Sequence, residues 1–249
     1  MTRAEILQIS KPILFSTLMV QAILKGLKTQ TRRVIKPKLS AGVPDGKYRY
    51  DGVQEGIHAI ELLSENGEPT EKYFSCGKPR YCPGDYIYVR ETWAWEPCVH
   101  CIMHNTCIMP ERRKHDKDCT CRYVYRVDYS DEALDPNSYF YEPDIFGEID
   151  SDFPACVTWK PSIHMPKEAA RIFLRVTDVR TERVNDISEN DAMAEGCVKG
   201  DKYFGENSSP ALTAKQSFMW LWNMINEKRG YGWAMNNWVW VYEFERVVL

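Results

Sequence analysis

The chain has 249 residues, of which 44% are hydrophobic and 27% are charged, a composition that excludes an intrinsically disordered protein and allows a sizeable hydrophobic core. The 32 basic and 35 acidic residues give a net charge of -3, so nucleic acid could be bound only through a local basic patch. No apolar run approaches the roughly 20 residues that span a bilayer, and the N-terminal MTRAEILQIS lacks the apolar segment of a signal peptide, which predicts a cytoplasmic protein without a membrane partner.

The first 80 residues are predicted to contain one helix between two short strands. A β-prone run at residues 11–17 precedes a helix over residues 16–25. The apolar residues of this helix recur at helical spacing: Val20, Ile23, Leu24 and Leu27. Gly26 suits the left-handed stop after the helix, and a strand over residues 31–35 follows. Residues 38–80 are rich in Gly, Pro, Ser and charge, and are predicted to be mostly loop with one hairpin at most.

The middle of the chain alternates predicted strands with polar segments. A Pro-Gly-Asp turn precedes a strand over residues 86–92, and RYVYRVDY predicts another strand over residues 122–129. The acidic residues 130–158 are punctuated by proline and are predicted to be loop. RIFLRVTDVRTERV, residues 171–184, predicts a long strand.

The C-terminal part is predicted to form two helices and a closing strand. Ser188 caps a short helix within residues 187–196, and Gly196 ends it. An amphipathic helix follows over residues 211–226, and then a strand over residues 237–248. Strands outnumber helices and rarely form βαβ units, which favours a mixed α+β barrel over a doubly wound sheet.

The stretch ILKGLKTQTRRVIK, residues 23–36, combines a threonine with several cations. Alternate residues of a strand point to the same side, so Thr31 and Arg33 share a face and Arg32 points away from it. Lys28 precedes the strand and can turn toward the same space. A threonine hydroxyl becomes a nucleophile when a base takes its proton, and lysine can be that base when burial or nearby positive charge lowers its pKa. The alternative is a solvated cationic helix end that suits the helix dipole.

The pattern Gly26-x-Lys28-x-x-x-x-Arg33, behind an amphipathic helix, resembles the signature of the ASCH domain family, whose fold is a PUA-like β-barrel. Further segments resemble the same family: YCPGDYIYVRETWAW, WKPSIHMPKEAARIFLRVTDVRTERVNDISENDAMAEG and LWNMINEKRGYGWAMNNWVWVYEF. The resemblance covers about residues 11–37, 81–95, 159–197 and 217–247. It implies a single ASCH domain over residues 1–249 with flanking helices. Its long form is similar to members common in bacteriophages and prophages, which implies a cytoplasmic location in a bacterial host cell.

One branch of small bacterial ASCH proteins hydrolyses N4-acetylcytidine to cytidine and acetate, using a lysine, a threonine and a glutamate near the end of a short helix. The resemblance places Lys28, Thr31 and Glu195 at these positions. Lys28 would activate Thr31 for attack on the acetyl carbonyl, and Glu195 would protonate the departing amine. Arg33 would hold the pocket or stabilise the oxyanion. Burial and the helix C-terminus would keep Glu195 protonated; the alternative is an exposed helix-end carboxylate.

The chain is much longer than those small hydrolases, and its inserts could reshape the pocket. The same residues could serve another substrate, such as a modified nucleobase in nucleic acid, because a shared fold does not carry substrate identity. Two other classes therefore stay open beside the amidohydrolase: a non-catalytic reader of RNA or modified nucleic acid, and a phage interaction protein. A reader would tolerate Thr31→Ala but lose affinity when Lys28 or Arg33 is neutralised.

Four further residues are candidates for holding a nucleoside or RNA-derived substrate. Trp93 follows a strand and could form a pocket wall, because aromatic faces stack on bases, although tryptophan is also a common core residue. Arg90, Lys160 and His164 are candidates for contacting a base edge or a phosphate. A single histidine is more often structural, which is the alternative for His164. No organic cofactor is predicted.

Nine cysteines, an odd number, argue against a disulfide framework in a cytoplasmic protein. Five lie in residues 98–121, within a predicted insertion at about residues 96–150. Two close pairs supply the four thiolates that a structural zinc site needs: Cys98, Cys101, Cys119 and Cys121. Cys107 or His115 could replace a member of the second pair. The sequence therefore predicts a zinc-stapled insertion, with reduced bystander thiols as the alternative.

Overall fold

The computed structural model describes residues 1–35, 46–54, 57–96, 98, 101, 119–128, 159–197 and 213–249. These residues belong to two compact units: the first lies within residues 1–11, 22–88 and 172–249, and the second within residues 12–21 and 89–171. The predicted insertion at about residues 96–150 falls in the second unit, and most of it lies outside the described residues, as does the predicted loop 130–158. In the described ranges, no helix is long and apolar enough to cross a membrane.

The first unit contains most of the regular structure. Its helices are α1 (Arg3–Ile9), α4 (Glu189–Ala194) and α5 (Ala214–Asn226), with 3-10 turns η6 (Val184–Asp186), η8 (Glu227–Arg229) and η9 (Trp233–Met235). Its strands are β2 (Gln30–Val34), β3 (Tyr48–Gln54), β4 (Ile57–Leu63), β5 (Pro69–Ser75), β9 (Phe173–Arg183) and β10 (Trp238–Val247). Strands β1 (Lys11–Leu14) and β6 (Tyr86–Arg90) and helix α2 (Thr17–Leu24) have residues in both units.

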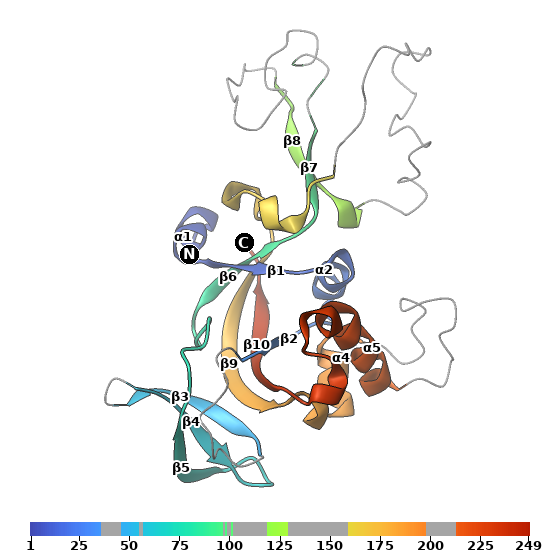
Figure 1. The fold of residues 1–249 in the computed structure, drawn as a ribbon. Coiled ribbons are helices and arrows are strands. Elements are labelled where there is room, and N and C mark those ends of the chain that lie inside the picture. Colours follow the sequence, from blue (N-terminus) through green and yellow to red (C-terminus); the bar gives the residue numbers. More distant parts are fainter. Residues whose placement is uncertain are drawn as a thin grey trace. The chain divides into compact units, whose positions relative to one another are not determined.

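The larger sheet has the strand order β1-β6-β9-β3-β4-β5, with β10 paired to both β9 and β2. Strands β9 and β10 are antiparallel from Trp238↔Arg183 to Val247↔Phe173, and Figure 1 shows them as two long curved strands side by side. The pairings form an open path from β1 to β5, so the sheet is not closed among the described residues. The fold is a mixed α+β arrangement with a sheet-rich core and few helices, as predicted.

The second unit contains a smaller sheet made of one hairpin. Strands β7 (Trp93–Glu96) and β8 (Arg122–Tyr125) pair antiparallel, with Trp93 opposite Tyr125 and Glu96 opposite Arg122. Three 3-10 turns complete the regular structure described in this unit: η2 (Arg126–Asp128), η4 (Ser162–His164) and η5 (Lys167–Ala169). The pair Glu91 and Arg171 holds the start of the hairpin, because the guanidinium donates to both carboxylate oxygens at 3.0 Å.

Most predicted elements with a clear hydrophobic period are confirmed. The helix predicted over residues 16–25 is α2, and Gly26 follows it with φ 73°. Ser188 caps α4 by accepting a hydrogen bond from the Asp191 backbone N–H. The predicted strand at residues 31–35 is β2, and the closing strand is β10.

One prediction of local structure is wrong, and two predicted strands end earlier than expected. Residues 38–80 were predicted to be mostly loop, yet they contain β3, β4 and β5, because Tyr48 and Ile60 are fully buried and the charge of Glu61 is paired with Arg49 at 3.0 Å. The strand predicted over residues 86–92 is β6 and ends at Arg90, two residues early, where Glu91 pairs with Arg171. The strand predicted over residues 122–129 ends at Tyr125 and turns into η2.

Candidate functional site

The backbone brings Lys28 next to Glu195 in the first unit. After α2 the chain turns at Gly26, and the N–H groups of Leu27 and Lys28 both donate to the Ala22 carbonyl, at 2.8 and 3.2 Å. Lys28 and Glu195 then form an antiparallel bridge. Gly196 allows this approach: its φ is +90°, and a Cβ there would lie 2.8 Å from the Ala22 Cβ. A glycine that ends α4 therefore also positions Glu195.

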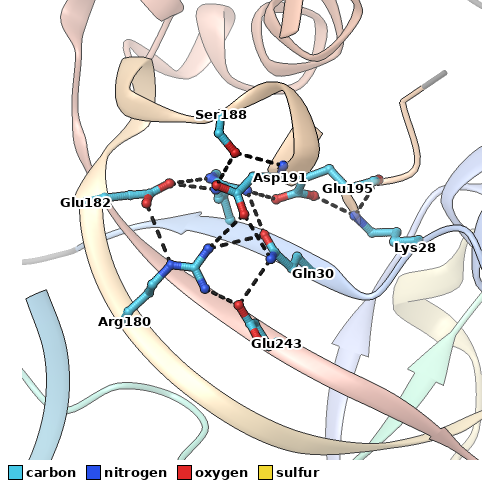
Figure 2. Close-up of polar contacts among 9 residues, drawn as sticks. Lys28, Gln30, Arg180, Glu182, Ser188, Asp191, Glu195 and Glu243 are labelled. Carbon is cyan, nitrogen blue, oxygen red and sulfur yellow. Dashed lines mark hydrogen bonds and ion pairs between the residues drawn. The ribbon is translucent and has the colours of Figure 1, made fainter. Parts of the chain in front are cut away.

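The side chains of Lys28 and Glu195 form a buried ion pair. Lys28 Nζ donates to Glu195 Oε2 at 2.6 Å and to the Glu195 carbonyl at 2.9 Å, and Figure 2 shows the two side chains pointing toward each other. The Lys28 side chain is 0% exposed and that of Glu195 is 2% exposed. Burial lowers the pKa of Lys28 against the opposing effect of Glu195, and the nearby charge of Arg33 lowers it further. Lys28 is thus less firmly protonated than an ordinary lysine.

Arg32 belongs to the same buried cluster as Lys28 and Glu195. Its side chain is 0% exposed, and NH1 donates to Glu195 Oε1 at 3.1 Å. Its other nitrogens donate to Glu182 Oε1, NH2 at 2.6 Å and Nε at 3.0 Å. The alternation along β2 does separate Arg32 from Thr31, but both faces of this strand are covered. Glu195 is therefore shared between an ammonium and a guanidinium.

The ionic network extends along β9 and into β10. Arg180 contacts Asp191 at 3.1 Å and also pairs with Glu243. Gln30 donates to both of these carboxylates at 3.1 Å (Figure 2). Burial raises the pKa of Asp191, but the Ser188 hydrogen bond and the Arg180 charge outweigh it and hold that pKa below its usual value. The sequence analysis did not anticipate this network, whose only local signal is the alternation of Arg180 and Glu182 on a strand.

Thr31 and Arg33 lie on the strand beside two tyrosines that the sequence analysis did not select. Thr31 is 1% exposed, and its partner across the sheet is Tyr242. The Tyr242 ring meets the Tyr81 ring edge to face at 5.1 Å. Burial lowers the pKa of half-buried Arg33, while Tyr81 and Glu195 oppose this shift. The alternation of aromatic residues in the closing strand could have indicated Tyr242.

The candidate substrate-binding residues lie in the second unit. Trp93, Lys160 and His164 line one pocket of about 500 Å³. The Trp93 and Lys160 backbones bond to each other, with N···O distances of 3.2 and 2.7 Å. Arg90 donates instead to the Ile163 carbonyl. The structure thus brings Lys28, Arg33 and Glu195 together in one unit, and places the four residues predicted to hold a substrate in the other.

Four cysteines of the second unit form a candidate metal centre. The Sγ atoms of Cys98, Cys101, Cys119 and Cys121 all lie within 4.8 Å of one another, and none forms a disulfide. The closest pairs are Cys101 with Cys119 at 3.5 Å and Cys98 with Cys121 at 3.6 Å. Four thiols this close can hold a metal ion. The alternative ligands Cys107 and His115 lie outside the described residues.

The chain was compared with models of protein families, with curated proteins and with solved structures, and none of the three comparisons found a match. The resemblance to the ASCH family accordingly stays a proposal that rests on the sequence motifs.

Proposed function

We propose that this chain is a member of the ASCH family with a PUA-like barrel, and that it hydrolyses an N4-acylated cytidine or a related nucleobase amide. The observation that carries the proposal is the Lys28–Glu195 ion pair, with 2.6 Å between Nζ and Oε2. These two residues are 167 positions apart in the sequence, and both were selected for the roles of base and acid. The contact brings the lysine and the glutamate of the resemblance into one buried cluster.

The pair can supply base and acid together because it shares one proton. With the proton on Nζ the pair is ionic; with the proton on Glu195 Oε2 it is neutral, and the net charge is the same. Burial penalises the ionic form and Arg33 disfavours the charge on Lys28, whereas the Arg32 guanidinium, 3.1 Å from Glu195 Oε1, favours the carboxylate. Transfer across the 2.6 Å contact leaves an amine that accepts a proton and a carboxylic acid that donates one.

In the acylation step, the Lys28 amine takes the hydroxyl proton of Thr31, and the Thr31 oxygen bonds to the amide carbonyl carbon. The tetrahedral intermediate collapses when its bond to N4 breaks and Glu195 gives its proton to that nitrogen. Cytidine leaves, and an ester on Thr31 remains. We assign the stabilisation of the oxyanion to Arg33, whose charge acts on both Lys28 and Glu195.

Hydrolysis of the ester restores the starting state. The Glu195 carboxylate takes a proton from water, whose oxygen attacks the ester carbon. The bond to the Thr31 oxygen breaks, and the Lys28 ammonium returns a proton to that oxygen. The products are cytidine and the free acid, with the shared proton back on Glu195. Because Thr31 is 1% exposed and Lys28 2%, the proposal requires that neighbouring side chains move aside when substrate binds.

We further propose that the four-cysteine cluster holds a structural zinc ion. Tetrahedral zinc with bonds of about 2.3 Å places its sulfur ligands about 3.8 Å apart, and the two closest pairs at 3.5 and 3.6 Å fit that geometry. The Cys98 backbone N–H also donates to Cys121 Sγ at 3.1 Å, which supports a thiolate there. Metal analysis of freshly purified protein should give about one zinc per chain; well under one would contradict the zinc proposal.

The proposed hydrolase is tested by incubating purified protein with N4-acetylcytidine and measuring cytidine release by chromatography. Thr31→Ala should abolish release, while Thr31→Ser should keep some of it because a hydroxyl remains. Thr29→Ala is the matched control, since Thr29 is exposed and should behave like the unchanged protein. Binding of N4-acetylcytidine without release, unchanged in Thr31→Ala, would overturn the hydrolase and favour a non-catalytic reader.

A further inference from the structure

The pocket of the second unit has walls that are held in place by its own backbone. One wall is Trp93 on β7. Its backbone N–H and carbonyl both form hydrogen bonds with the backbone of Lys160. The Tyr123 ring meets Trp93 edge to face at 5.6 Å, and Trp159 completes the aromatic lining. The volume of about 500 Å³ lies within the range of small-molecule pockets, roughly 300–1,000 Å³. Its size and three aromatic side chains suit one planar ligand.

The charges at the pocket select against a cationic ligand. Lys160 Nζ lies 5.0 Å from the centre of the Trp93 ring, so this aromatic face already contacts an ammonium group. His164 adds a second nitrogen donor, and Glu168 is the acidic residue of the lining. A quaternary ammonium ligand would compete with Lys160 for the same indole face. An anionic group can instead pair with Lys160 by a charge-assisted hydrogen bond.

Trp93 also has an unsatisfied donor. The residue is 3% exposed, and its indole N–H has no hydrogen-bond acceptor among the described residues. Leaving a buried donor without an acceptor is unfavourable, and most buried indole N–H groups find a partner. A ligand that carries a carbonyl or a ring nitrogen would supply the acceptor that the described residues lack.

We infer that this pocket binds a nucleotide, with the base against Tyr123 and Trp159, an acceptor of the base at the Trp93 N–H, and the phosphate at Lys160 and His164. A nucleobase is planar, stacks on aromatic side chains and carries acceptors for the Trp93 N–H, and its phosphate can pair with Lys160. A free nucleotide and one residue of a single-stranded nucleic acid share this chemistry. The inference does not depend on amide hydrolysis at Thr31, because its residues belong to the second unit.

Calorimetry with cytidine 5′-monophosphate, cytidine, inorganic phosphate and a short single-stranded RNA tests the inference. The monophosphate should bind more tightly than cytidine or phosphate alone, and Lys160→Met should weaken it by about tenfold or more, as expected for a lost charged hydrogen bond. Lys72→Met, at an exposed lysine on β5, makes the same charge change and should have no effect. Tighter binding of the RNA than of the monophosphate would identify nucleic acid as the source, and the reverse would identify the free nucleotide.

Nuclear magnetic resonance of the tryptophan indole N–H groups locates the ligand. The Trp93 resonance, assigned by its loss in Trp93→Phe, should move when the monophosphate is added, as should that of Trp159. Titration that leaves both resonances in place would overturn the inference, as would equal affinities for monophosphate in Lys160→Met and in the unchanged protein.

Discussion

The buried ion-pair network around Lys28 in the first unit and the Trp93 pocket in the second unit hold their polar groups in different ways. In the first unit, Lys28, Arg32, Glu182 and Glu195 have side chains at most 2% exposed, and each carries at least one ionic partner. In the second unit, the indole N–H of Trp93 is buried beside a pocket and finds no acceptor in the part of the chain that the structure describes, and exposed His164 lines the same pocket. The charges of the Lys28 network act on the protonation of its own side chains, as in catalytic sites. The Trp93 pocket leaves an indole N–H that a ligand can satisfy.

The largest expected effect is on the buried network. Arg32→Met removes the cation that Glu182 and Glu195 share, so two buried carboxylates lose a partner at once. Breaking a buried ion pair from one side costs about 3–5 kcal/mol, and the free energy of unfolding should fall by that amount. The measurement is the midpoint of denaturant unfolding, analysed at an unchanged slope.

The matched control is Arg175 on β9, which pairs with Glu245 on the neighbouring strand β10 but is exposed. Arg175 contacts Glu245 at 2.8 Å, with side chains 48% and 56% exposed, so Arg175→Met should cost no more than about 1 kcal/mol. Equal losses in the two variants would show that burial of the network does not matter for stability.

The next effect is expected from metal removal in the second unit. The cysteine cluster lies at one end of the β7–β8 hairpin, and Trp93 and Tyr123 on the same hairpin line the pocket. A chelator, or Cys121→Ser, should therefore speed hydrogen exchange of the β7 and β8 amides and weaken nucleotide binding by about tenfold, or about 1.4 kcal/mol. The amides of β9 and β10 serve as the internal reference. If hydrogen exchange of the β7 and β8 amides is unchanged in metal-free protein, the cysteine cluster does not stabilise the pocket.

A smaller effect concerns the pH dependence of hydrolysis. The reaction requires unprotonated Lys28, so turnover should rise as the pH approaches the pKa of Lys28, which burial lowers. Arg33 lowers the pKa of Lys28, so Arg33→Met should raise it and move the profile toward higher pH. The pH profile of turnover checks this shift. If Arg33→Met lowers the rate of turnover but leaves its pH dependence unchanged, Arg33 acts only by stabilising the oxyanion.

The sequence analysis found elements whose signal is local and failed where the signal is long-range. The helical period and Gly26 were enough to predict α2, and Ser188 was enough to place the start of α4. Strand alternation correctly separated Arg32 from Thr31, but it cannot tell whether a face is solvated. Only the fold shows that Arg32 lies 5.7 Å from the centre of the Phe218 ring on α5.

The same limit applies to the β3–β5 region and to the division into units. Charged residues in 38–80 were interpreted as solvated loop, whereas buried Glu61 is compensated by Arg49, which comes from another strand. Candidate substrate residues such as Trp93 and Lys160 were grouped with Lys28 because their chemistry matched, yet chemistry alone does not place residues in one unit. Cysteine spacing succeeded for the four thiols because close pairs at hairpin ends need little tertiary information.

The most direct test of the shared-proton account is turnover of N4-acetylcytidine by four proteins: the unchanged chain, Lys28→Met, Glu195→Gln and the double variant, each assayed below its melting temperature. The account predicts that either single change lowers turnover by about 100-fold or more, and that the double variant is no worse than the poorer single one, because the two residues act as a unit. The account is contradicted if the double variant loses as much turnover as the two single losses combined, or if the unchanged protein releases no cytidine.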